Sequence, residues 1–92
     1  MWARVATFEG DPADIDARIE RVRSVFESGP PRELPDAKFL LLADHESGRT
    51  LGVALFDSEE ALRKGHEIMN AGPGHAGGRS SVQFYEVPIH RL

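Results

Sequence analysis

The sequence predicts an α+β fold, in which a sheet of four strands carries two helices on one face. Four segments are rich in aromatic, aliphatic and β-branched residues, two others space their apolar residues as a helix does, and their order is β-α-β-β-α-β. This is the order of the ferredoxin-like arrangement, whose sheet is antiparallel. Because 92 residues suffice for one domain and are too few for two, residues 1–92 are expected to form a single domain.

Local chemistry marks the first strand and the first helix. Trp2 to Phe8, WARVATF, has the composition of a strand. Asp11 suits the N-cap of the following helix, because its carboxylate can accept from free backbone N–H groups, and Pro12 suits the first turn. Gly29, with two prolines after it, ends the helix. The apolar residues between these signals form one stripe: Ile15, Ile19, Val22 and Phe26.

The stretch KFLLLADHESGRTLGVALF, Lys38 to Phe56, predicts a β-hairpin with strands at Ala37 to Ala43 and Thr50 to Phe56. Gly48 is available for a positive φ in the turn. Apolar residues are consecutive in both strands instead of alternating with polar ones, so both faces of the sheet are apolar here. Alternation can divide the side chains into two sets, Phe39, Leu41, Leu51, Val53 and Leu55 on one face, and Leu40, Leu42, Ala54 and Phe56 on the other.

A second helix and a last strand complete the chain. In FDSEEALRKGHEIMN, Asp57 as N-cap and Glu60 three residues on have the spacing of a capping box. SSVQFYEVPIHRL reads as the last strand, with Pro88 favouring an edge or a bulge. The loop AGPGHAGGR between them leaves a helix and enters a strand, the reverse of a phosphate-binding loop, so we expect a mobile segment or a lid over a cavity. One face of the helix is expected to be formed by Ala61, Leu62, Gly65, Ile68 and Met69.

The second face of the sheet predicts an assembly. Two helices can cover only one face of the sheet, and an apolar face left bare marks an interaction surface. The simplest cover is the same face of a second copy, which would form a two-fold homodimer of sheet on sheet.

Composition excludes several classes of function. No apolar run approaches the roughly 20 residues that span a bilayer, so no membrane partner is expected. The net charge is −4 and there is no basic stripe, which argues against nucleic acid as a partner. The chain contains no cysteine, so disulfides and thiolate chemistry are excluded, and the N-terminus lacks the pattern of a signal peptide. We therefore expect a cytoplasmic location.

A family resemblance adds to these predictions. LLADHESGRTLGVALFDSEEALR, the closing YEVPIH and the opening WARVATFEGDP resemble the antibiotic biosynthesis monooxygenase (ABM) group of the dimeric α+β barrel superfamily, over nearly the whole chain. The resemblance implies two sheets that close into a barrel across a dimer, with a ligand cavity between sheet and helices in each subunit. It also implies, if the protein is an enzyme, a cofactor-free monooxygenase acting on a small phenolic or quinone-type compound. No segment is a catalytic signature, so architecture is implied more strongly than activity.

The candidate site follows from this resemblance. Cofactor-independent oxygenases of the family hold and polarise an aromatic substrate with tryptophan, asparagine, tyrosine and arginine, and this chain offers Trp2, Arg4, Asn70 and Tyr85. His66 joins them because it lies beside Gly65, whose missing side chain leaves space for a flat ligand. Arg4 is costly to bury unpaired, so we expect it to pair with an acid such as Glu86, to reach solvent or to bind an anionic substrate. The predicted cavity residues are Trp2, Arg4, His66 and Tyr85.

Other functions stay open at this point. A non-catalytic ligand-binding or stress-related dimer is the main alternative. Heme handling is a third, because heme-degrading members of the family use a histidine on the second helix, where His66 lies, but they also use a first-strand asparagine that WARVATF lacks. Asp44, His45 and Glu46 are metal-ligand types, but three adjacent side chains in a turn diverge, so no metal site is expected.

Overall fold

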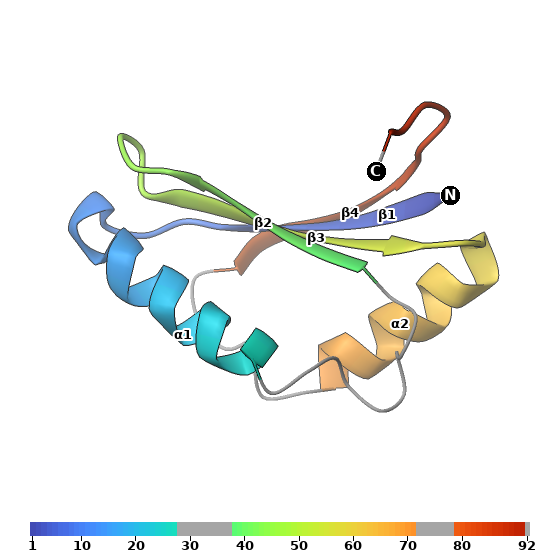
Figure 1. Ribbon diagram of the computed structural model, residues 1–92, viewed down its shortest axis with the longest axis horizontal. Helices are drawn as coiled ribbons and strands as arrows, with labels where there is room; N and C mark the ends of the chain where they lie inside the picture. The colour runs from blue at the N-terminus through green and yellow to red at the C-terminus, as the bar shows by residue number, and fades with distance from the viewer. Residues whose placement is uncertain (28–37, 72–78, 92) are drawn as a thin grey trace.

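A computed structural model describes residues 1–27, 38–71 and 79–91, and these form a ferredoxin-like α+β fold. The described strands make one antiparallel sheet in the order β2-β3-β1-β4, with both α-helices on one side of it (Figure 1). The predicted fold class and element order are therefore confirmed. Along the chain, the elements are β1 (Trp2–Phe8), the 3-10 turn η1 (Pro12–Asp14), α1 (Ile15–Glu27), β2 (Lys38–Asp44), β3 (Arg49–Phe56), α2 (Glu59–Ala71) and β4 (Arg79–Glu86). The predicted lid falls almost entirely on residues 72–78, outside the described part.

The register of the hairpin corrects the predicted division of its side chains. Asp44 pairs with Arg49 across a four-residue turn, so every pair joins an odd-numbered residue to an even-numbered one, and Phe39 lies opposite Ala54. The division within each strand was right, but the sets were matched wrongly across the turn. On the face toward the helices lie Phe39, Leu41, Ala54 and Phe56, and on the outer face lie Leu40, Leu42, Leu51, Val53 and Leu55.

The start of α1 is anchored to the β2–β3 turn. Asp11 caps η1 as predicted, its side chain accepting from the backbone N–H of Ala13 at 2.9 Å. Gly48 has φ +80°, and a Cβ there would lie 2.0 Å from the carbonyl oxygen of Gly10, so only glycine fits both the conformation and the contact. Nη1 of Arg18 donates to the carbonyl oxygen of Gly48 at 3.4 Å and to Oγ1 of Thr50 at 3.3 Å. These contacts hold one end of the helix against the sheet.

The cap of α2 is one residue later than predicted. The hydroxyl of Ser58 accepts from the backbone N–H of Ala61 at 3.1 Å, and its carbonyl oxygen accepts from Leu62 N–H at 3.0 Å. Ser58 is therefore the N-cap, and the predicted capping box from Asp57 to Glu60 was wrong, because the first helical hydrogen bond starts from Ser58.

The core lies between α2 and the sheet. Its buried cluster is Ala54, Phe56 and Leu62, against which Trp2, Phe39, Ala61, Ile68 and Met69 pack. The apolar face predicted for this helix is confirmed, since its members are buried or half-buried. Strand β4 ends at Glu86, so Pro88 lies beyond it, and the N–H of Val87 donates to the carbonyl oxygen of Met1 at 2.8 Å. Within the described residues, no helix has the length and hydropathy to cross a membrane.

Candidate functional site

Two of the predicted site residues contact each other. Arg4, on β1, is only 4% exposed, and its Nε donates to Nδ1 of His66 on α2 at 3.0 Å. Its Nη1 lies 3.9 Å from the sulfur of Met69. The expectation that Arg4 reaches solvent is thus wrong, because the side chain turns under α2. The sheet and the second helix are therefore joined by a polar contact between residues 62 positions apart.

This contact fixes the protonation of His66. A guanidinium group only donates hydrogen bonds, so Nδ1 of His66 must be the acceptor and the ring hydrogen lies on Nε2. Phe84 of β4 packs edge-on to the imidazole, with ring centroids 4.9 Å apart and planes at 77°. His66 is half-buried. The site thus holds a neutral imidazole in one orientation, with Nε2–H as a hydrogen-bond donor.

The other two predicted residues are separated by the sheet. Trp2 is half-buried and packs against the core cluster on the helix side, on the same face as Arg4. Tyr85 pairs with Ala3 and so lies on the outer face, where it is 49% exposed and its hydroxyl donates to Oε1 of Gln83 at 2.6 Å. Trp2, Arg4 and His66 share one side of the sheet, and Tyr85 lies on the other. The side chain of Asn70 is outside the described part.

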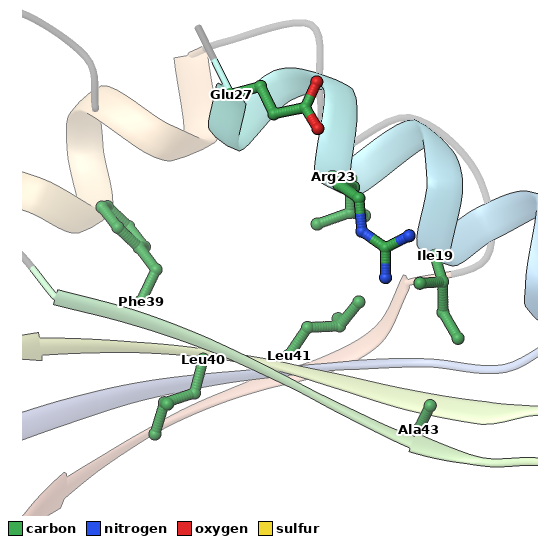
Figure 2. A pocket seen from close by; sticks show the side chains of 8 residues that line it. Ile19, Arg23, Glu27, Phe39, Leu40, Leu41 and Ala43 are labelled. Carbon is green, nitrogen blue, oxygen red and sulfur yellow. The ribbon is translucent and has the colours of Figure 1, made fainter. Parts of the chain in front are cut away.

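A pocket of about 500 Å³ lies between α1 and β2, on the helix side of the sheet. Figure 2 shows Leu41 and Ala43 pointing toward α1, Phe39 rising on the same face beside α2, and Leu40 pointing to the opposite side of β2. Two charged side chains of α1, Arg23 and Glu27, also border it. The apolar lining is Ile19, Val22, Phe39, Leu40, Leu41 and Ala43.

The predicted site residues do not line this pocket. The sequence signals that could have found it are the α1 stripe and the apolar run of β2, both of which were assigned to core packing. These two sequence patterns do not show that a space remains between α1 and β2. The pocket lies at the α1 end of the fold, and neither Arg4 nor His66 borders it; that it is the expected ligand cavity stays a prediction.

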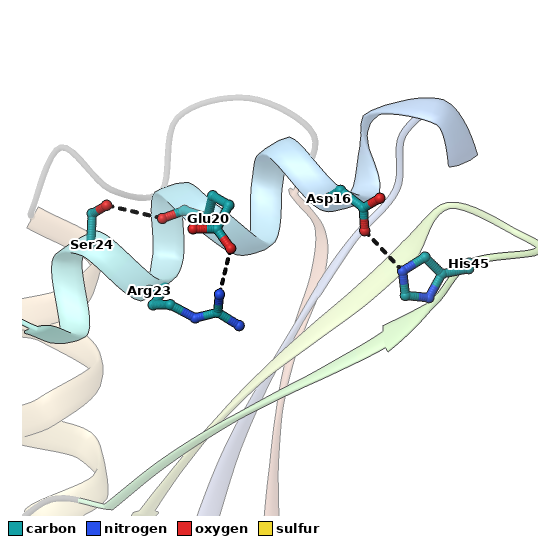
Figure 3. Close-up of polar contacts among 5 residues, drawn as sticks. All are labelled: Asp16, Glu20, Arg23, Ser24 and His45. Carbon is teal, nitrogen blue, oxygen red and sulfur yellow. Dashed lines mark hydrogen bonds and ion pairs between the residues drawn. The ribbon is translucent and has the colours of Figure 1, made fainter.

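Exposed polar contacts surround the first helix (Figure 3). Arg23 forms an ion pair with Glu20, and the hydroxyl of Ser24 donates to the carbonyl oxygen of Glu20 at 3.0 Å. Nε2 of His45, in the β2–β3 turn, lies 3.3 Å from Oδ1 of Asp16. All four side chains of these two ion pairs are more than half exposed, so each pair contributes little to stability.

Asp44 organises the β2–β3 turn. Its carboxylate accepts from the N–H of Glu46 and from the hydroxyl of Ser47, both at 3.0 Å. The Glu46 N–H first, and the Ser47 hydroxyl second, hold the pKa of the Asp44 carboxyl below its usual value of 3.8. Within the described residues, no group of three or more acidic or histidine side chains is placed to hold a metal ion.

The outer face of the sheet is apolar toward β2 and β3 and mixed toward β4. Leu40 and Leu42 are 45% and 51% exposed, and Leu51 and Val53 beside them are half-buried. On the β1–β4 side, the same face carries polar residues at Thr7, Ser81 and Gln83 together with Val5 and Tyr85. Its exposed aliphatic side chains are therefore those of β2.

The sequence matches no protein-family model, and a search of curated proteins found no match either. The class of the protein is therefore defined by its topology: it has the ferredoxin-like α+β fold.

Proposed function

We propose that the protein is a homodimer of the dimeric α+β barrel type, and that each subunit binds a small apolar or aromatic molecule. The observation that supports this best is the pocket between α1 and β2. It is open to solvent and mostly apolar in its lining, and its volume of about 500 Å³ lies within the range of roughly 300–1,000 Å³ typical of small-molecule sites. The resemblance to the ABM group, which implies a ligand cavity between sheet and helices, agrees with this placement. The cytoplasmic location stays a prediction.

A neutral fluorescent probe such as N-phenyl-1-naphthylamine tests the pocket. Val22→Trp would fill the space beside the pocket, and Val25→Trp is the matched control, because Val25 is 65% exposed on the same helix and does not border the pocket. We expect the first variant to lose probe binding by tenfold or more and the control to keep it. Ala43→Phe fills the pocket from the strand side, in case Val22→Trp disturbs the helix. Equal binding by all three variants would refute the assignment.

The homodimer rests on the outer face. Leu42 is half exposed on this face with Leu40 beside it, and covering apolar surface contributes about 25 cal/mol per Å². Sedimentation at micromolar concentration tests the assembly. We expect a dimer that Leu42→Arg weakens at least tenfold, and that Gln83→Arg, on the polar part of the same face, weakens much less. If the wild-type protein sediments as a monomer at this concentration, the proposed homodimer is wrong.

A second candidate function is cofactor-free oxygenation, favoured by the contact between Arg4 and His66. In such a reaction an activated methylene of a phenolic or quinone-type compound takes up dioxygen and gives a carbonyl and water, so the substrate itself supplies the electrons. The Nε2–H of His66 is a donor that could stabilise a substrate oxyanion. Oxygen uptake with a hydroxyanthrone tests this: His66→Ala and Trp2→Phe should each slow turnover. Rates unchanged in both would count against these residues.

Heme handling is the weakest of the three. Iron would bind Nε2 of His66, and the ring hydrogen would then have to move to Nδ1, which accepts from Arg4 at 3.0 Å. Binding heme thus costs the Arg4 contact. Titration with hemin is expected to give no Soret shift, and a shift that is lost in His66→Ala would reverse this ranking.

A further inference from the structure

The sulfur of Met69 lies beside the buried guanidinium group of Arg4. Nη1 of Arg4 donates to this sulfur at 3.9 Å, and Arg4 is 4% exposed. A thioether sulfur is a weak acceptor, so the hydrogen bond uses little of the donor strength of a cation. Met69 does not border the pocket between α1 and β2, and the functions proposed above give it no role.

Oxidation of Met69 would turn this weak acceptor into a strong one. Hydrogen peroxide converts a methionine thioether into a sulfoxide, which is polar where the thioether is apolar. In this step the sulfur gives an electron pair to one oxygen of the peroxide, and the S–O bond forms as the O–O bond breaks. The departing hydroxide takes the proton of the transferred oxygen and leaves as water. The sulfur is thus oxidised and the peroxide is reduced.

Arg4 distinguishes Met69 from an ordinary core methionine. A sulfoxide in an apolar core disrupts the packing, because its oxygen is buried without a hydrogen-bond donor. Here the oxygen would be bonded to an atom 3.9 Å from Nη1 of Arg4, and the rotatable bonds of the methionine side chain let it turn toward that nitrogen. A hydrogen bond from an ionised donor is roughly twice as strong as one between neutral groups. The guanidinium group therefore stabilises the oxidised side chain.

Met69 is also open to a small oxidant. It is half-buried, so part of its surface is in contact with solvent, and it packs against the core cluster of Ala54, Phe56 and Leu62. Helix α2 lies on the side of the sheet opposite to the outer face (Figure 1). A second copy seated on the outer face would therefore leave Met69 uncovered.

We infer that Met69 is a site of reversible oxidation by peroxide, and that Arg4 binds the oxygen of its sulfoxide. The oxidised side chain then links α2 to β1 through a charge-assisted hydrogen bond, next to the contact of Arg4 with His66. Reduction of the sulfoxide by methionine sulfoxide reductases restores the weak contact. The inference depends neither on the ligand pocket nor on the homodimer.

Thermal unfolding after treatment with hydrogen peroxide tests the inference. The chain has two methionines, Met1 and Met69, and no cysteine, so a peptide map assigns the added oxygen. We expect Met69 to be oxidised in the folded protein without a loss in the thermal midpoint, and the reductases to remove the oxygen again. Met69→Leu, treated in the same way, is the control for oxidation elsewhere in the chain.

Three outcomes of this experiment would overturn the inference. The first is that Met69 stays unoxidised in the folded protein while free methionine in the same solution is oxidised. The second is that treatment lowers the midpoint of the wild type more than that of Met69→Leu. The third is that the reductases leave the sulfoxide in place, because the modification is then not reversible.

Variants of Arg4 and Met69 test the role of the guanidinium group. In Arg4→Leu the sulfoxide loses this donor, so treatment with peroxide should lower the midpoint by about 4 °C or more. Met69→Gln places an amide acceptor near Arg4 without peroxide, in case Arg4→Leu does not fold. Ile68→Gln is its matched control, because Ile68 packs against the same core cluster.

We expect Met69→Gln to lower the midpoint less than Ile68→Gln does. If these two variants lose equally, or if wild type and Arg4→Leu respond equally to peroxide, Arg4 does not bind the acceptor at position 69 and the inference is wrong.

Discussion

The two helices lie on the same side of one sheet, yet they contact it differently. Helix α2 closes its half: Leu62 has no exposed surface, and Arg4 reaches up from the sheet to His66. Helix α1 is held at its first turn, where Ile15 is 1% exposed, and farther along it borders the pocket, where Ile19 and Val22 are only half-buried (Figure 1). The comparison shows that one arrangement of elements can pack closely in one half and loosely in the other.

The size of the sheet residues accounts for this difference. Under α2 the sheet presents Trp2 and Phe56, which fill the space up to the helix. Toward α1 the same face presents Ala43 and Gly52 beside Leu41, so part of it carries small residues. A Cβ added at Gly52 would meet only the ring of Phe8, at 3.9 Å, which is an ordinary contact. Small residues on the strands thus leave room that the α1 side chains do not fill.

The largest effect is expected at Leu62. Leu62→Ala removes a fully buried side chain and should cost about 2–5 kcal/mol of unfolding free energy. Ile19→Ala removes the same number of carbons from a half-buried position beside the pocket, and should cost about 1 kcal/mol. Denaturant unfolding of both variants measures the difference. Equal losses would mean that α1 is packed as closely as α2, and would break the comparison.

The second largest loss of unfolding free energy is expected when His66 is replaced. His66→Ala removes the acceptor from a guanidinium that is 4% exposed, which should cost about 1–3 kcal/mol. Because the two residues interact, Arg4→Met combined with His66→Ala should cost less than the sum of the single changes. His45→Ala, at an exposed turn residue, is expected to stay within about 0.5 kcal/mol. If the loss of unfolding free energy in the double variant equals the sum of the losses in the two single variants, Arg4 and His66 are not energetically coupled.

Replacing Gly52 is expected to raise the stability of the protein. Glycine inside a strand costs roughly 0.5–1 kcal/mol relative to alanine, and the Cβ has room here, so Gly52→Ala should raise the thermal midpoint. Gly48→Ala is the contrasting variant, because its Cβ would collide with the Gly10 carbonyl and its φ is positive. If Gly52→Ala lowers the thermal midpoint instead of raising it, the space beside α1 is already filled.

The smallest effect is a pH dependence at the turn that anchors α1. The pKa of Asp44 is lowered in the folded chain, so its ionised form stabilises the fold above the usual value of 3.8, and this stabilisation disappears as the pH falls through the lowered pKa. The unfolding free energies of wild type and Asp44→Ala should therefore differ near neutral pH and converge as the pH falls through the lowered pKa. If the unfolding free energies of wild type and Asp44→Ala differ by the same amount at every pH, the contribution of Asp44 comes from packing and not from its charge.

How much the sequence could predict depends on the range of the interactions. Strands and helices were predicted correctly because apolar spacing and end signals such as Asp11 are local. The helix cap was placed one residue early because Asp57 and Ser58 are both good N-caps, and only the hydrogen bonds decide between them. The faces of the hairpin were matched wrongly because the match depends on the number of residues in the turn.

The site was less predictable for the same physical reason. The sequence could not say which face of the sheet carries Arg4, and the contact of Arg4 with His66 spans 62 positions and has no local signal. Tyr85 lies on the outer face, which follows from its pairing with Ala3. The pocket depends on how far α1 stands from β2, and that distance is a property of the assembled fold.

The sheet order has a consequence for biosynthesis. Strand β1 is synthesised before the other three strands, but it lies inside the sheet between β3 and β4, and the N–H of Val87 bonds to the carbonyl oxygen of Met1. One edge of β1 therefore stays open until β4 has been synthesised. An unpaired edge is a template for association with other chains. Nascent chains that stop before Arg79 should thus be the species most dependent on chaperones.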